Sequence, residues 1–253
     1  MLARALTAVS PALRGSLHVR QTCLPLSRVA QRKNVLAHAS AASGGAEQDA
    51  VNVFLIDGKL VERPLGAVQR LSKPLQAAFV AAVYGALGLG TWAWCAHVGP
   101  AIAAAAPGLH AFFVGTRMAW LGALFTVVGV AHFTAHDVIK SMYPKQGSWG
   151  FWSLPGSASF HTNWTGVAEV LGGGALLLAW AVPSLLPKLP AGLLPLVNKC
   201  LFALTLAVTP ANIYMCTHNA PGPSPALLPW PVHLWRLVMQ VVLLSSFWDM
   251  AHP

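Results

Sequence analysis

The chain has 253 residues, of which 55% are hydrophobic and only 9% charged, and its mean hydropathy is +0.57. A soluble domain has about 25% charged residues, so this composition excludes a soluble globular enzyme and indicates an integral membrane protein. The net charge of +9 does not indicate nucleic-acid binding, because six of the 16 basic residues lie in residues 1–46 and the others nearly balance the seven acidic residues.

Residues 1–46 have the composition of an organelle transit peptide. They hold no acidic residue, are rich in Ala, Ser, Leu and Arg, and lack the continuous apolar core of a secretory signal. The stretch "NVLAHASAASGGAEQD" favours a plastid address, so we expect a chloroplast membrane, either thylakoid or inner envelope. A mitochondrial inner membrane is the alternative, because several apolar residues lie near one helical face: Leu2, Leu6, Val9, Leu13 and Leu17.

Residues 47–73 are polar enough to form a soluble segment outside the membrane. Asp57 and Gly58 separate two apolar-leaning strands in "VNVFLIDGKLVERPL", and Asp-Gly between such strands favours a type I′ hairpin. A lone hairpin is only marginally stable in water. We therefore expect it to pack on the helices or on a partner.

Five apolar segments follow, and each is long enough to cross a hydrocarbon core of about 30 Å. We place them at 75–98, 111–133, 164–186, 196–216 and 232–250. Pro100 and Pro107 are expected to separate the first segment from the second, with an uncharged loop over 99–110. Pro210 is expected to kink the fourth segment. The predicted fold class is an all-α integral membrane protein.

Lys and Arg residues in the flanks set the expected orientation. They gather on the side that holds the processed N-terminus: Lys59, Arg63, Arg70, Lys73, Lys140 and Lys145. That side is expected to face the stroma, or the matrix in a mitochondrion, and the C-terminus to face away. Most tryptophans near the predicted helix ends are expected to be interfacial anchors: Trp92, Trp94, Trp149, Trp152, Trp164, Trp230, Trp235 and Trp248.

A carboxylate, Glu169, lies inside the third segment, where a charge costs roughly 3 kcal/mol on insertion scales. The topology places it at the level of Asn212 and Arg236, with His132 at the surface nearby. Gln240 follows Arg236 by one helical turn on the same face. We expect Arg236 to be the partner of Glu169, and the five polar residues to meet.

The cysteines, the histidines and the absence of catalytic motifs disfavour several kinds of functional site. None of the cysteines forms a C-x-x-C pair, so buried inert thiols are expected: Cys23, Cys95, Cys200 and Cys216. His132 and His136 have an i, i+4 spacing, but no facing histidine is apparent, which disfavours haem or a metal. No catalytic signature of a soluble enzyme occurs. Gly172–Gly174 is expected to let a neighbouring backbone approach closely.

Four segments resemble the DoxX-like membrane proteins, in the same order along residues 111–250: "VGVAHF", "WTGVAEVLGGGALLL", "TPANIYMCTH" and "LWRLVMQ". The resemblance implies a four-helix membrane bundle, to which residues 75–98 add one N-terminal transmembrane helix. The family takes its name from a membrane subunit of a thiosulfate:quinone oxidoreductase, and many relatives have no established activity. By this resemblance, twelve residues match positions of the family pattern: His132, Phe133, Glu169, Gly172, Gly173, Pro210, Ala211, Asn212, Tyr214, Met215, Arg236 and Gln240.

Two functions remain open at this point; a third, a carrier or proton pathway, has little support from five helices without paired repeats. In the first, the chain is a small-ligand or quinone-associated subunit of a membrane redox process, and the expected ligand-binding residues are Glu169, Asn212, Arg236, His132 and Gln240. In the second, it is a noncatalytic scaffold or assembly partner of a membrane complex that uses residues 47–73 and the long loop after the second segment. Residues 151–160 are expected to be an interfacial loop, with a quinone headgroup rim as the alternative. Asn212 is expected to be an interhelical hydrogen-bond donor.

Overall fold

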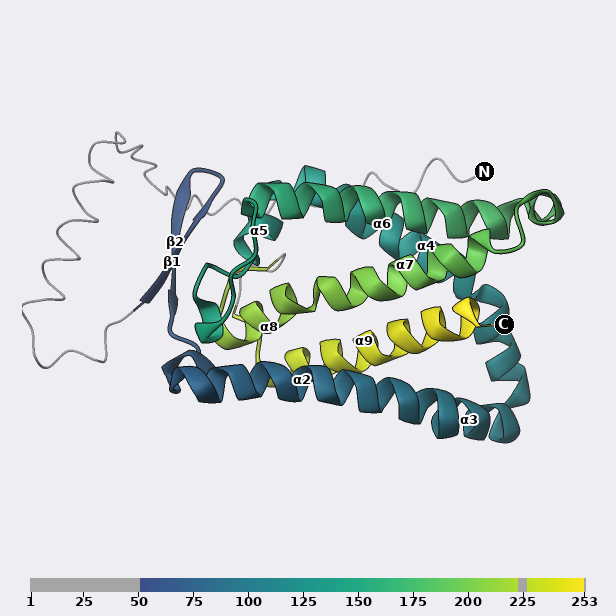
Figure 1. Cartoon of the computed structure of the whole chain (residues 1–253), viewed down its shortest axis with the longest axis horizontal. Helices are drawn as coiled ribbons and strands as arrows, with labels where there is room; N and C mark the ends of the chain where they lie inside the picture. Colours follow the sequence, from purple (N-terminus) through teal and green to yellow (C-terminus); the bar gives the residue numbers. More distant parts are fainter. Residues whose placement is uncertain (1–50, 223–226, 253) are drawn as a thin grey trace, which may run out of the picture. The chain divides into compact units, whose positions relative to one another are not determined.

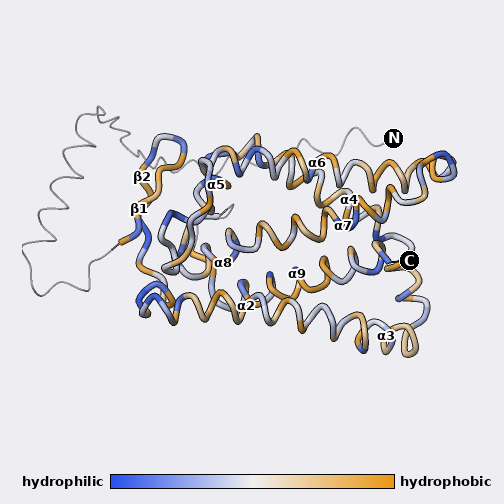
Figure 2. Tube along the Cα trace, viewed as in Figure 1, coloured by the Kyte–Doolittle hydropathy of each residue, from blue (hydrophilic) through white to orange (hydrophobic). Residues whose placement is uncertain are grey.

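The computed structural model describes residues 51–222 and 227–252 of the chain, which are mostly helical (Figure 1). The predicted transit peptide, residues 1–46, lies outside the described residues. Four helical stretches are long and apolar enough to cross a membrane: Lys73–Ala105, Pro107–Thr134, Ala158–Ala181 and Leu193–His218. Hydrophobic residues predominate along these helices, and hydrophilic residues gather near their ends and in the hairpin (Figure 2). The described residues therefore have the fold of a multi-pass, all-α membrane protein.

The predicted hairpin is present and precedes the helices. Strands β1 (Val51–Ile56) and β2 (Lys59–Pro64) pair antiparallel, with Ile56 opposite Lys59 at the turn. Asp57 and Gly58 have φ angles of 48° and 72°, as a type I′ turn requires of both central residues. One face of β1 is buried, including Phe54, which belongs to a core cluster with Trp149 and Tyr214. The hairpin thus packs on the helical part of the chain.

The first helical stretch is longer than predicted. After η1 (Val68–Arg70), it comprises α2 (Lys73–Ala93), the π-helical turn η2 (Trp94–Val98) and α3 (Gly99–Ala105). The prediction that Pro100 ends this stretch was wrong, because Pro100 lies in the first turn of α3, where a missing N–H is tolerated. The expected loop over 99–110 is reduced to Ala106, since α4 (Pro107–Thr134) begins with the next residue.

The remaining elements complete the bundle: α5 (His136–Ser141), η3 (Ser148–Gly150), α6 (Ala158–Ala181), η4 (Pro183–Lys188), α7 (Leu193–Ala207), α8 (Thr209–His218) and α9 (Trp230–Ala251). Val208 separates α7 from α8, and Pro210 lies in the first turn of α8, so the predicted interruption occurs there. Over the predicted fifth segment, α9 has 22 residues. It packs on α7 and α2, but it is not among the four stretches that are apolar enough to span a membrane.

Glycines bring α4 and α6 into backbone contact. A Cβ atom on Gly173 would lie 2.6 Å from the amide nitrogen of Thr126, and one on Gly129 would lie 2.8 Å from the carbonyl oxygen of Gly166. The expected close approach at Gly172–Gly174 is thus made by Gly173 toward α4. A Cβ on Gly174 would meet nothing within 4 Å.

Trp149 is an exception to the expectation that most tryptophans near helix ends are interfacial anchors. It is 1% exposed and lies beneath the hairpin, where its Nε1 donates a hydrogen bond to Thr217 Oγ1 at 3.0 Å. Its φ angle of 56° is in the left-handed region, which is strained for a bulky residue. A core cluster of seven buried residues holds this end together: Phe54, Val80, Trp149, Ile213, Tyr214, Met215 and Ala220.

Candidate functional site

A pocket of about 480 Å³ lies among α4, α6, α7, α8, α9 and the segment that joins α5 to α6. The five polar residues that the sequence predicts to meet all line it: His132, Glu169, Asn212, Arg236 and Gln240. Apolar side chains form much of the remaining wall, including Leu124, Val128 and Leu243. A mainly apolar cavity with a few convergent polar groups is the usual form of a small-molecule site.

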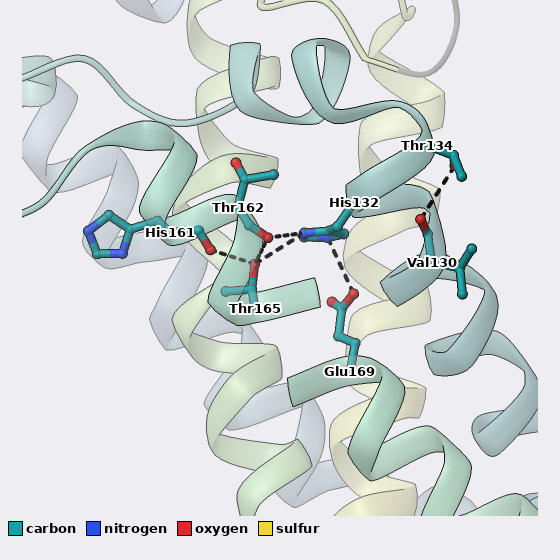
Figure 3. A network of polar contacts seen from close by, with 7 residues as sticks. All are labelled: Val130, His132, Thr134, His161, Thr162, Thr165 and Glu169. Carbon is teal, nitrogen blue, oxygen red and sulfur yellow. Dashed lines mark hydrogen bonds and ion pairs between the residues drawn. The ribbon is translucent and has the colours of Figure 1, made fainter. Parts of the chain in front are cut away.

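The ring of His132 is fixed from the side of α6. Its Nδ1 lies 2.7 Å from the carbonyl oxygen of Thr162 (Figure 3). Because a carbonyl oxygen can only accept, Nδ1 must carry the hydrogen and donate it. Thr165 Oγ1 is also close, at 3.2 Å from Nδ1, and donates its own hydrogen to the carbonyl oxygen of His161 at 2.7 Å. The other ring nitrogen, Nε2, is therefore left for Glu169.

His132 Nε2 lies 3.3 Å from Glu169 Oε2, and the two side chains are 10% and 6% exposed. The same Oε2 makes no hydrogen bond of good geometry, so the contact is close but incompletely aligned. Because an uncompensated charge is costly where both side chains are buried, the arrangement favours a single further proton between Nε2 and Oε2. The pair is then either a neutral imidazole with a carboxylic acid or an imidazolium with a carboxylate. Its net charge is zero in both forms.

This pairing corrects the expected ion pair of Glu169 with Arg236. The backbone contact between α4 and α6 brings His132 Nε2 to 3.3 Å from Glu169 Oε2, whereas Arg236 forms no ion pair within 4.0 Å among the described residues. Arg236 instead donates from Nη2 to Asn212 Oδ1 and from Nη1 to Met215 Sδ, the latter at 3.2 Å. Asn212 therefore joins two helices as predicted, but as an acceptor and not as a donor.

Arg236 is half-buried and lines the pocket without a carboxylate partner. Among the described residues, Arg236 takes part in no ion pair within 4.0 Å. A guanidinium has five N–H donors, and within the described part of the chain Arg236 makes two donor contacts, to Asn212 and Met215. Because the His132 and Glu169 pair is neutral overall, Arg236 gives the pocket a net positive charge.

Gln240 holds the wall of the pocket together. Its Nε2 donates to the carbonyl oxygen of Thr205 at 3.2 Å and to Thr209 Oγ1 at 2.5 Å. These two bonds tie α9 to the junction of α7 and α8, so both amide hydrogens of Gln240 are engaged within the protein.

The segment between α5 and α6 supplies pocket residues that sequence reasoning did not assign to the site. Tyr143 Oη and Trp152 Nε1 are buried without a hydrogen bond of good geometry, and both residues line the pocket. Burial raises the pKa of Tyr143, so its hydroxyl is neutral and can donate. Trp152 falls in the stretch 151–160, for which a ligand rim was the alternative interpretation. No periodic pattern in this loop could have shown that it folds back over the helices.

His161 also lines the pocket, but both its ring nitrogens are engaged. Nε2 lies 2.8 Å from the carbonyl oxygen of Pro155 and must donate to it, and Nδ1 accepts from Trp164 Nε1 at 3.1 Å. The ring stacks on Tyr143 with centroids 4.9 Å apart. His161 therefore positions two aromatic walls and has no nitrogen left for a ligand.

The i, i+4 spacing of His132 and His136 does not fall within one helix, because α4 ends at Thr134 and His136 belongs to α5. Among the described residues, no group of three or more His, Cys, Asp or Glu side chains could hold a metal ion. Arg117, on α4, is not a pocket residue and lies 4.0 Å from Asp249.

Comparison with known protein families, with curated proteins and with solved structures finds no match to this chain. The family resemblance thus depends on the four sequence segments quoted above.

Proposed function

We propose that the chain is a DoxX-like protein of a chloroplast membrane, with four bundle helices and one added N-terminal transmembrane helix. In this proposal its pocket binds a small ligand with an electron-rich oxygen headgroup. A quinone is the candidate ligand, and the protein would be the quinone-associated subunit of a membrane redox process. The observation that carries the proposal is Arg236, a half-buried cation that faces the pocket without a carboxylate partner among the described residues.

An unpaired cation away from water is costly unless another group compensates it. An oxygen atom of a bound headgroup can accept from the guanidinium hydrogens that the protein leaves free. At the other side of the pocket, the shared proton of His132 and Glu169 lies next to an Oε2 atom that lacks a well-formed hydrogen bond. A ligand with two acceptor oxygens on an apolar ring, as in a quinone, matches this arrangement.

The proposal is tested by purifying the processed protein from native membranes in mild detergent and extracting its bound quinone. Arg236→Gln is expected to lower quinone retention by about tenfold or more, because a hydrogen bond to a charged group contributes roughly 1.5–3 kcal/mol. Glu169→Gln is expected to lower retention as well, with the bundle still folded. Arg117→Gln is the matched control, because Arg117 lies on a membrane helix but outside the pocket.

Thermal unfolding of each variant separates loss of binding from loss of fold. If neither the wild-type protein nor the Arg117→Gln control holds quinone while both are folded, the quinone-associated function is wrong. Retention that falls equally in the control and in the pocket variants would also contradict it.

A second candidate function, a noncatalytic assembly partner, is favoured by the outer face of the hairpin. Leu55 and Leu60 are cross-strand partners and are 61% and 48% exposed. Val51 and Val53 are exposed on the same strand face. Exposed apolar surface outside the membrane is typical of protein interaction sites.

This function predicts co-purification with a larger complex. The double variant Leu55→Lys, Leu60→Lys should abolish the association while leaving quinone retention unchanged. Deletion of residues 47–73 should also abolish the association. Lys59→Ala, at the turn of the same hairpin, is the control. Association that survives both the double variant and the deletion would exclude the hairpin as the docking surface.

A further inference from the structure

A second hollow, of about 570 Å³, lies between α6 and α7, and its lining is almost wholly apolar. Small residues form part of its floor, among them Gly172, Ala203 and Ala207. Cys200 also lines it and is an exposed free thiol, which corrects the expectation that this cysteine is buried. We call this hollow the α6–α7 groove.

The α6–α7 groove borders the pocket that contains Arg236. Trp164 and Ala207 line both cavities. Trp164 is held in place by the hydrogen bond from its Nε1 to His161 Nδ1. Ala207 lies on the opposite helix, α7, and has a small side chain. The pocket and the α6–α7 groove therefore adjoin at Trp164 and Ala207.

Close contacts hold two other sides of the pocket together. Gly129 and Gly166 bring the backbones of α4 and α6 into contact. The two hydrogen bonds of Gln240 tie α9 to the junction of α7 and α8. The α6–α7 groove offers an apolar path to a ligand too long for the pocket.

We propose that the α6–α7 groove holds the hydrocarbon tail of the molecule whose headgroup binds in the pocket. This inference depends on the proposed ligand-binding function and narrows the ligand to an amphiphile with a compact, oxygen-bearing headgroup and one long hydrocarbon chain. A pocket of about 480 Å³ accommodates a substituted ring, and the adjoining groove accommodates the chain. Bulk lipid in the groove is the competing occupant.

The first test compares two quinones that differ only in the tail. They are tetramethyl-1,4-benzoquinone and its analogue in which one methyl group is replaced by a decyl chain, each titrated into the purified protein in lipid nanodiscs. Ala203→Phe should fill the groove without touching the pocket, because Ala203 is exposed and lines the groove but not the pocket. We expect it to weaken binding of the decyl quinone about tenfold and to leave the tetramethyl quinone unchanged. The control is Ala123→Phe, at an exposed position on α4 that lines neither cavity.

The second test uses the thiol of Cys200 as a reporter of groove occupancy. In a protein that carries Cys95→Ser and Cys216→Ser, the labelling rate of Cys200 by a maleimide is measured with each quinone. Neither quinone has a free ring position to which a thiol could add. The decyl quinone should slow labelling several-fold, whereas the tetramethyl quinone should not.

The outcomes separate this inference from the function on which it depends. If both quinones bind equally and neither Ala203→Phe nor Cys200 labelling distinguishes them, the groove proposal is overturned and the ligand pocket stands. If labelling is equally slow with and without the decyl quinone, bulk lipid fills the groove and the proposal is again overturned. If neither quinone binds to the folded protein, the proposed function itself fails.

Discussion

At the scale of single residues, the proton shared by His132 and Glu169 makes the two side chains one unit. Glu169→Gln keeps a hydrogen-bond donor in front of Nε2, so we expect little change in the free energy of unfolding. His132→Ala removes the donor to the Thr162 carbonyl and the partner of Glu169, and it should cost about 1–3 kcal/mol because buried polar groups are left unsatisfied. Thermal unfolding in one detergent measures both. Equal losses in the two variants would contradict a shared proton.

The sequence could predict which polar residues meet but not how they pair. Depth along a helix follows from residue count at 1.5 Å per residue, and it brought His132, Glu169 and Arg236 to one level. Partner choice depends on interaxial distance, which here is set by the glycine contacts between α4 and α6. Tyr143 and Trp152 were not identified because the loop that carries them has no periodicity from which its path could be read.

At the scale of elements, the contact between α4 and α6 can be tested with two adjacent glycines. A Cβ atom on Gly173 would press on backbone atoms of α4, namely the amide of Thr126 and the carbonyl of Gly122. Gly173→Ala should therefore destabilise the bundle by about 1–3 kcal/mol, as overpacking does. Gly174→Ala has open space around it and should be neutral or slightly stabilising, since Ala favours helix. Similar unfolding curves for the two variants would show that the α4–α6 contact is looser than described.

The hairpin tip depends on a carboxylate outside the membrane. Asp137 accepts a hydrogen bond from Lys140 Nζ at 2.5 Å, and its Oδ2 accepts one from the amide of Asp57 at 3.3 Å. The Lys140 bond holds the pKa of Asp137 below its ordinary value of 3.8. A lowered pKa means that this stabilisation is complete above about pH 4 and is lost as the pH falls through the folded-state value.

Nuclear magnetic resonance of selectively labelled Asp should follow this loss. The Asp57 amide resonance is expected to move upfield between pH 5 and pH 2, with a midpoint below 3.8. A His136→Gln background removes the neighbouring imidazole, which lies 3.6 Å from the same carboxylate. In the Asp137→Asn variant, the Asp57 amide resonance should lose this titration, because the carboxylate is absent. A midpoint at or above the ordinary value would mean that Lys140 does not hold the carboxylate in solution.

Local sequence signals predicted elements only where one residue pair decides the backbone. Asp57 and Gly58 specify the hairpin, because both adopt positive φ angles at the turn. Pro100 was a misleading signal. A proline ends a helix only where its missing N–H leaves a carbonyl of the preceding turn without a hydrogen bond. Here the π-helical turn η2 precedes it and the helix continues to Ala105.

At the scale of the whole molecule, the number of membrane passes depends on α9. Its 22 residues would extend roughly 33 Å at 1.5 Å per residue, enough for a core of about 30 Å. Its polar residues lower the average hydropathy, but Gln240, Ser245 and Ser246 are buried inside the bundle. Leu234 and Val238 are among its exposed residues. Lipid would therefore meet an apolar surface, and we predict that α9 is a fifth span.

Five spans place the hairpin and the C-terminus on opposite faces of the membrane, whereas four place them on the same face. The two cases are distinguished by single cysteines, Lys59→Cys in the hairpin and His252→Cys after α9, in a protein whose Cys95, Cys200 and Cys216 are replaced by Ser. In sealed vesicles of one orientation, a membrane-impermeant maleimide should label only one of them, and opening the vesicles should expose the other. Labelling of both cysteines from one face would mean that α9 lies along the membrane surface or re-enters the membrane. Lipid or a partner helix would then have to cover the pocket wall that Arg236 and Gln240 form.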